Sequence, residues 1–131
     1  MKHVHLNLTE SQEKTFTSIL NVLKKEREIK KTDYDAIALL VINMTMLSQA
    51  VDTINSDGAM IVSHNQHGEV IKKNPATELA QQCQTAMRHL FVELLMTPKS
   101  RLAVSAMAAQ DTPEEDDPLA AALKARAKRG T

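Results

Sequence analysis

Aromatic side chains are scarce in this chain: they make up 2% of its 131 residues, and tryptophan is absent. Leucine, isoleucine, valine, alanine and seven methionines must therefore fill the core. Methionine is flexible and packs adaptably, so the composition favours helices that close against one another, including helices of separate subunits. The length predicts one domain followed by a tail.

The chain has one cysteine, Cys83, which excludes an internal disulfide and indicates a reducing compartment. No apolar run follows residues 1–5, so no signal peptide is expected. No apolar stretch reaches the roughly 20 residues that a membrane span requires. We expect a soluble, cytoplasmic protein.

Sequence signs of catalysis are missing. The chain has no glycine-rich phosphate loop and no Gly-x-Ser-x-Gly elbow. Cys83 and His89 lie six positions apart on one predicted helix, about 600° of turn, so they point to different sides. Zinc prefers four ligands, and the remaining histidines form two separate pairs: His3 with His5, and His64 with His67. We expect no metal, no cofactor and no enzymatic activity.

The net charge is zero, but the charges are segregated. Residues 1–31 hold seven basic and four acidic side chains, residues 109–117 five acidic and no basic ones, and residues 118–131 four basic and no acidic ones. Such blocks mark interaction segments or solvated tails. Clustered cations can contact DNA phosphates. Two candidate sets are Lys24, Lys25, Arg27, Lys30 and Lys31, and Lys72, Lys73, Lys99 and Arg101. The alternative is an ordinary charged surface.

Two helices are predicted before residue 58. A capping box from Thr9 to Gln12 opens the first, and apolar residues follow it at helical spacing. Thr32 is expected to cap the second, which should run to about Ser56. Residues 36–42 are apolar on every face, and a helix of that kind must be buried all round. A small monomer has little with which to cover it, so we expect contacts between subunits at Ile37, Leu40, Val41 and Met44.

The next segment predicts a β-hairpin. Residues 59–63 and 69–73 are β-prone and flank a turn-rich loop at residues 64–68. Asn74–Pro75 then combines an N-cap with a proline at the first helical position. The helix that follows should pack antiparallel to the second one. Thr97–Pro98 is a second N-cap followed by proline, and it predicts a short helix at residues 98–107.

The predicted fold is therefore mainly α: an N-terminal helix, a long antiparallel helix pair with an inserted hairpin, a short last helix and a flexible tail. Residues 1–108 would form a helical DNA-binding and oligomerisation domain, and residues 109–131 an acidic linker and basic tail. Residues 119–129 are too short for a stable isolated helix. They could dock on a partner as an amphipathic helix, through Leu119, Leu123, Lys124, Arg126, Lys128 and Arg129. A basic tail that touches DNA, or nothing, is the alternative.

An ordered set of short motifs resembles one family of phage terminase small subunits. The motifs are Gly58, Asn65-Gln66-His67-Gly68, Lys73-Asn74-Pro75-Ala76, Leu90, Glu93-Leu94 and Thr97-Pro98-Lys99-Ser100-Arg101. The chain differs at Leu95–Met96, where the family often has glycine. The resemblance implies a subunit that binds double-stranded viral DNA in the host cytoplasm and assembles with itself as a ring. It also implies that the DNA is presented to the large terminase subunit, which holds the ATPase and the nuclease.

A helix-turn-helix transcription regulator that binds DNA as a dimer is the alternative. Against it, residues 29–32 contain no glycine, and the second helix is too apolar to be a recognition helix.

Overall fold

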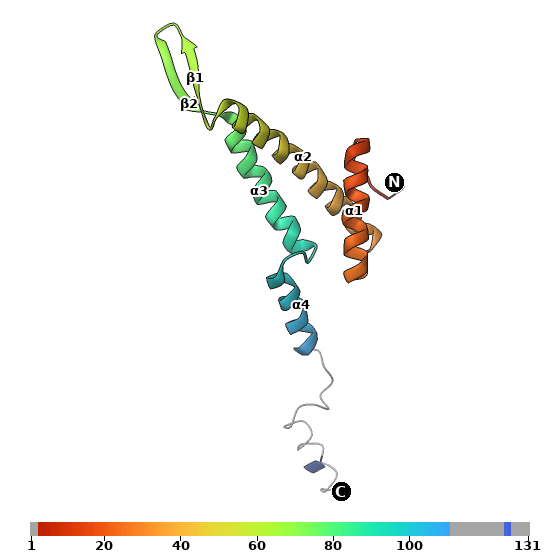
Figure 1. Ribbon diagram of the computed structural model, residues 1–131. Coiled ribbons are helices and arrows are strands. Elements are labelled where there is room, and N and C mark those ends of the chain that lie inside the picture. Colours follow the sequence, from red (N-terminus) through yellow and green to blue (C-terminus); the bar gives the residue numbers. More distant parts are fainter. Residues whose placement is uncertain (1–2, 111–124, 127–131) are drawn as a thin grey trace. The chain divides into compact units, whose positions relative to one another are not determined.

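The computed structural model describes residues 3–110 and 125–126, and these form helices and one β-hairpin (Figure 1). The elements in chain order are α1 (Glu10–Glu26), the 3-10 turn η1 (Lys31–Asp33), α2 (Tyr34–Asp57), β1 (Met60–Asn65), β2 (Gly68–Lys73), α3 (Pro75–Glu93) and α4 (Pro98–Gln110). The prediction of a mainly helical chain with a hairpin between its second and third long helices is confirmed. The chain divides into two compact units, Met1–Leu94 and Leu95–Thr131, so α4 groups with the second unit.

Helix α1 begins at the predicted capping box. The Thr9 hydroxyl accepts a hydrogen bond from the Gln12 backbone N–H at 3.3 Å, and the Gln12 side chain accepts one from the Thr9 N–H at 3.0 Å. The Gln12 amide also donates to the Thr45 hydroxyl of α2 at 3.1 Å. Phe16 and Leu23 are buried on the face of α1 that the apolar spacing predicted. The same capping residue thus starts α1 and holds it against α2.

The start of α2 differs from the prediction: Thr32 does not cap the helix. Thr32 lies exposed inside η1, and the Asp33 carboxylate accepts a hydrogen bond from the Lys30 N–H at 3.0 Å. The side-chain capping interaction therefore forms at the start of η1, and α2 itself has no side-chain cap. The helix ends at Asp57, one residue past the expected Ser56, because Gly58 adopts φ 88°, which favours glycine.

Helices α2 and α3 lie side by side and antiparallel (Figure 1). Small buried side chains on the two helices, among them Ala50, Ala80 and Cys83, allow them to approach closely. In the first half of α2, Ile37 and Leu40 are fully buried. The segment Lys31–Asp57 is long and apolar enough to cross a membrane by length and composition alone. This corrects the expectation that no apolar stretch is long enough, and 33% of the segment's most apolar 18-residue window is buried within the chain.

The hairpin has a tighter turn than the five-residue loop predicted from the sequence. Asn65 pairs with Gly68, which leaves only Gln66 and His67 in the loop. The Asn65 side chain accepts a hydrogen bond from the His67 N–H at 2.8 Å, and Gly68 adopts φ 114°. The hydrogen bond to Asn65 and the positive φ of Gly68 form a two-residue turn. Asn65 and Gly68 can therefore pair in the strand ladder, although both residue types are typical of loops.

Asn74 joins the hairpin to α3 and is 4% exposed. Its side-chain amide donates to the Gly58 carbonyl at 2.8 Å, and its backbone N–H donates to the Ala59 carbonyl at 2.9 Å. Its side-chain oxygen accepts from the Ala76 N–H at 3.0 Å, which confirms the predicted N-cap. One side chain therefore closes the base of the hairpin and begins α3.

In the second unit, α4 begins at the predicted Thr97–Pro98 cap and runs three residues past the expected end at residue 107. The Thr97 hydroxyl accepts a hydrogen bond from the Ser100 N–H at 3.2 Å. Leu95 has φ 56°, the left-handed conformation that favours glycine, at a position where the resembled family often has glycine. The expectations for a linker and docking tail fall outside the described residues, including those at Leu119, Leu123, Lys124, Lys128 and Arg129. Arg126 belongs to a described helical pair.

Candidate nucleic-acid interface

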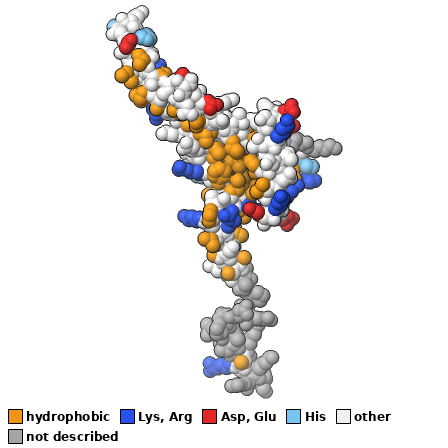
Figure 2. All heavy atoms as spheres, viewed as in Figure 1, with side chains coloured by type: hydrophobic (Ala, Val, Ile, Leu, Met, Phe, Trp, Pro, Cys, Tyr) orange, Lys and Arg blue, Asp and Glu red, His pale blue; other side chains and the backbone are white. Residues whose placement is uncertain are grey.

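The most basic surface of the first unit lies where α1 ends and η1 begins. Residues 24–31 hold five basic and two acidic side chains, a net charge of +3. Lys24 and Lys25 occupy the last turn of α1, while Lys30 and Lys31 lie at the start of η1. All four lysines are exposed, and Figure 2 shows basic side chains over this end of α1. We call them the junction lysines; their placement suits contacts with phosphates.

The base of this surface is fixed by aromatic contacts. The Lys24 ammonium lies 5.9 Å from the centroid of the Tyr34 ring. The Tyr34 ring in turn meets the buried Phe16 ring edge to face, with their centroids 5.8 Å apart. A cation over an exposed aromatic ring gains about 0.5–1 kcal/mol, which restrains the side chain without neutralising it. Lys24 is therefore restrained beside Tyr34 and remains exposed at the junction.

Arg27, the fifth predicted cation, has a different environment. Its guanidinium donates a hydrogen bond to the Leu94 carbonyl at the end of α3 and pairs with Glu26 at 3.2 Å. Its side chain is 18% exposed. A carbonyl at a helix end lacks an intrahelical partner, so Arg27 satisfies that group and ties the end of α1 to the end of α3. The junction lysines are the cations that remain exposed.

The second predicted set of cations is divided between the two units. Lys72 and Lys73 are exposed on β2, where they pair with Ile61 and Met60 and so point to opposite faces of the hairpin. Lys99 and Arg101 are exposed in the first turn of α4. The structure of neither unit brings these four residues together as one site.

The four residues predicted to lie between subunits are mostly buried within their own chain. Ile37 and Leu40 are 0% exposed and Val41 is 1% exposed, whereas Met44 is 37% exposed. Of this set, only Met44 reaches the surface to an extent that a second copy could contact.

A pair of hydrogen bonds that the sequence did not reveal attaches the N-terminal segment to α2. Asp35 accepts hydrogen bonds from the His5 ring at 2.6 Å and from the His5 backbone N–H at 2.7 Å. These hydrogen bonds hold the pKa of Asp35 below its ordinary value. The two residues are 30 positions apart, and neither belongs to a motif, so only the fold brings them together.

This contact predicts a pH dependence. Because the folded pKa of Asp35 is lowered, attachment of the segment is at full strength above the ordinary Asp pKa of about 3.9 and is lost as the pH falls through the folded value. In an NMR titration, the His5 amide resonance should shift with a midpoint below about 3.9, and Asp35→Ala should remove that shift. A midpoint at or above the ordinary value would contradict the contact.

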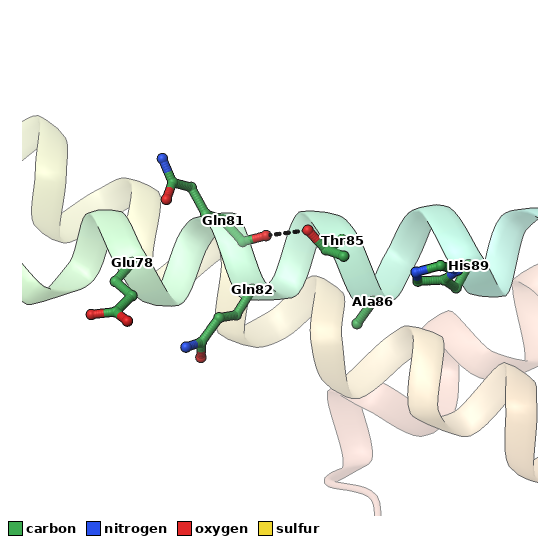
Figure 3. A pocket seen from close by; sticks show the side chains of 6 residues that line it. All are labelled: Glu78, Gln81, Gln82, Thr85, Ala86 and His89. Atoms are coloured by element: carbon green, nitrogen blue, oxygen red, sulfur yellow. Dashed lines mark hydrogen bonds between the residues drawn. The ribbon is translucent and has the colours of Figure 1, made fainter.

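An open pocket lies along α3 (Figure 3). Its lining residues are Glu78, Gln81, Gln82, Thr85, Ala86 and His89, and the Thr85 hydroxyl donates to the Gln81 carbonyl at 3.0 Å. Glu78 and His89 are eleven residues apart, about 16 Å along a helix axis, so they do not form an acid–base pair. The pocket offers amides and hydroxyls for contact but no catalytic arrangement.

The described residues 3–110 and 125–126 contain no group of three or more histidine, cysteine or acidic side chains with the placement of a metal site. His64 instead lies 3.6 Å from Glu69 across the hairpin, and His5 is occupied by Asp35. Cys83 is a buried residue of α3, the core role that the sequence predicted for it.

Comparison with known proteins gives one family. The chain matches the family model described as phage terminase, small subunit, over residues 13–111. The matched region runs from the first turn of α1 past the end of α4 and includes the junction lysines and the hairpin. No significant match was found to a curated protein or to a solved structure.

Proposed function

Because the chain belongs to the phage terminase small-subunit family, we propose that it binds double-stranded viral DNA as a ring of identical copies and recruits and regulates the large terminase subunit. The observation that carries this proposal is the family match, which spans 13–111 and so covers every element from α1 to α4. Membership itself implies a role in DNA packaging. We propose the ring, the DNA surface and the docking of the large subunit in addition to that role.

Membership also answers whether the chain is an enzyme. Terminase small subunits are non-catalytic, and the large subunit carries the activities. The expectation of a non-enzymatic protein is thereby confirmed. A phage terminase subunit acts within the infected host cell, and we place this one in the host cytoplasm.

The junction lysines are the proposed DNA surface. They are exposed, lie within eight residues of one another, and belong to a segment with a net charge of +3. Contacts of this kind bind the phosphate backbone without reading sequence, and they make affinity depend steeply on salt.

The regulator alternative has no support in the geometry of α2. A recognition helix must present polar side chains to the major groove. Helix α2 has no basic residue, and its Ile37, Leu40 and Val41 are buried. A dimeric helix-turn-helix protein that reads DNA through this helix is therefore disfavoured.

Deletion of the C-terminal tail tests whether the tail docks on the large subunit. We expect that deletion of residues 118–131 leaves the native mass and most DNA binding unchanged, because the helices and the junction lysines all lie upstream. The deletion should abolish stimulation of the large subunit's ATPase, measured with purified large subunit and duplex DNA. A truncated protein that still stimulates the ATPase fully but binds DNA poorly would identify the tail as a DNA arm.

A further inference from the structure

The hairpin exposes an apolar face. Residues paired across an antiparallel ladder share a face, so Met60, Val62 and Ile71 lie together with Lys73. Met60 is 56% exposed, Val62 54% and Ile71 70%. We call these three residues the hairpin face. Figure 2 shows apolar side chains at the surface of the hairpin.

A hairpin with such a face needs a partner. Two isolated strands are marginally stable in water, and stability requires a third strand or packing against a helix. Within the described residues, every side chain of β2 is exposed, so the first unit supplies neither a third strand nor a helix that covers the hairpin. The Asn74 contacts hold the base of the hairpin but leave its strands uncovered.

The charges of the first unit indicate what the partner is. The hairpin carries Lys72 and Lys73 against Glu69, a net charge of +1 with neutral histidines. Helices α2 and α3 together carry five acidic side chains and one basic side chain, Arg88, a net charge of −4. Asp52 and Glu78 are exposed, and neither makes an ion pair within residues 3–110.

The same helix pair also exposes apolar side chains. Val51 of α2 is 40% exposed, and Leu79 and Val92 of α3 are 39% and 51% exposed. On the face shown in Figure 2, apolar side chains gather where α2 passes between α1 and α3. The helix pair therefore combines negative charge with exposed apolar surface, and both properties complement the hairpin.

We propose that the hairpin of one copy docks on the α2–α3 pair of the next copy, with the hairpin face toward the helices and Lys73, which shares that face, beside their carboxylates. The donor and acceptor surfaces differ, so the contact is head to tail and can be repeated from copy to copy. A rotation that closes gives a ring. This inference rests on the self-association in the proposed function but not on its DNA or motor steps.

DNA is the less suitable partner for the hairpin. A duplex presents phosphates that would pair with Lys72 and Lys73. It would leave Val62 and Ile71 in water, since the phosphate backbone offers no apolar surface to cover them. A helix pair with exposed valine and leucine covers them and offers carboxylates to Lys73 as well.

A charge-swap experiment on the full chain tests the contact. One variant carries Lys72→Glu and Lys73→Glu, and the other carries Asp52→Lys and Glu78→Lys. All four side chains are exposed, so both variants should fold, which far-UV circular dichroism can verify. Each variant alone brings like charges together and should sediment as smaller species than the native protein. In an equimolar mixture, each contact between the two different variants joins opposite charges, so mixing should recover larger assemblies that contain both variants.

The apolar half of the contact has a matched test. Ile71→Asp should reduce the native mass, whereas Leu102→Asp on α4 should not, although the two side chains are equally exposed at 70% and 69%. Native mass in each single charge variant, or dissociation that mixing does not reverse, would overturn the inference. So would native mass in Ile71→Asp.

The outcomes separate this inference from the proposed function. An intact assembly in all variants, with weakened DNA binding after the Lys72 and Lys73 changes, would make these lysines phosphate contacts and leave the proposed function standing. A wild-type protein that stays monomeric would remove both the contact and the ring.

Discussion

Replacement of Leu40 by alanine should lower the free energy of unfolding of the subunit by about 2–5 kcal/mol, the cost of a cavity at a fully buried leucine. The sequence predicted this residue at a contact between subunits, but its side chain is 0% exposed within one chain. Loss of Leu40 should therefore appear first as unfolding and not as dissociation. Urea denaturation followed by circular dichroism, at one fixed protein concentration, measures the effect.

Leu39 provides the control, because it has the same chemistry one position earlier and is 43% exposed. Leu39→Ala should change the free energy of unfolding by about 0.5 kcal/mol or less. Equal destabilisation by the two substitutions would mean that α2 is not oriented as described. Unchanged stability of Leu40→Ala, accompanied by smaller assemblies, would return Leu40 to an interface between copies.

Replacement of all the junction lysines, Lys24, Lys25, Lys30 and Lys31, by alanine should weaken duplex binding by on the order of 10- to 1000-fold near physiological salt. Each lost phosphate contact reduces the slope of log affinity against log salt by about 0.9, so the slope should fall by up to about 3.6 for each subunit that contacts the duplex. Fluorescence anisotropy of a labelled duplex at several salt concentrations gives both quantities. The native mass should stay unchanged.

Lys14→Ala is the matched control for the lysine series. Lys14 also belongs to α1 but lies in its first half, 3.4 Å from Glu10, away from the junction. Its loss should leave the slope unaltered. If the slope of the fourfold variant also stays at the wild-type value, the phosphate contacts lie elsewhere, and Lys72, Lys73, Lys99 and Arg101 become the set to replace.

Local signals in the sequence predicted most of the helix boundaries. The Thr9 capping box, the Asn74–Pro75 pair and the Thr97–Pro98 pair each act through neighbours within three residues, and each begins a helix where expected. The signal at Thr32 was wrong because Asp33 competes for the same backbone region and bonds to Lys30 instead. Which of two adjacent polar side chains bonds to the backbone depends on the local backbone geometry, and residue type alone does not specify that geometry.

The site was harder to predict because it depends on contacts between distant parts of the chain. The basic run at residues 24–31 indicated a charged surface, but only the fold shows that Arg27 is committed to the Leu94 carbonyl. The apolar character of residues 36–42 predicted burial on every face, but Leu39 is 43% exposed, so only part of this segment is buried. The apolar character did not reveal that the chain's own helices supply that burial. The hairpin face could have been inferred from the alternation of Met60 and Val62, had the strand register been known.

The reactivity of Cys83 toward thiol reagents can report the separation of α2 from α3. Cys83 is the one cysteine in the chain, and the residue is 2% exposed on α3, which packs against α2. A thiol reagent can reach it only when that helix pair separates, so the modification rate at limiting reagent measures how often the pair opens. The same protection makes the wild-type chain a silent background for site-specific labelling. A cysteine introduced at an exposed position would react within the interval during which Cys83 stays shielded, without any prior removal of the native thiol.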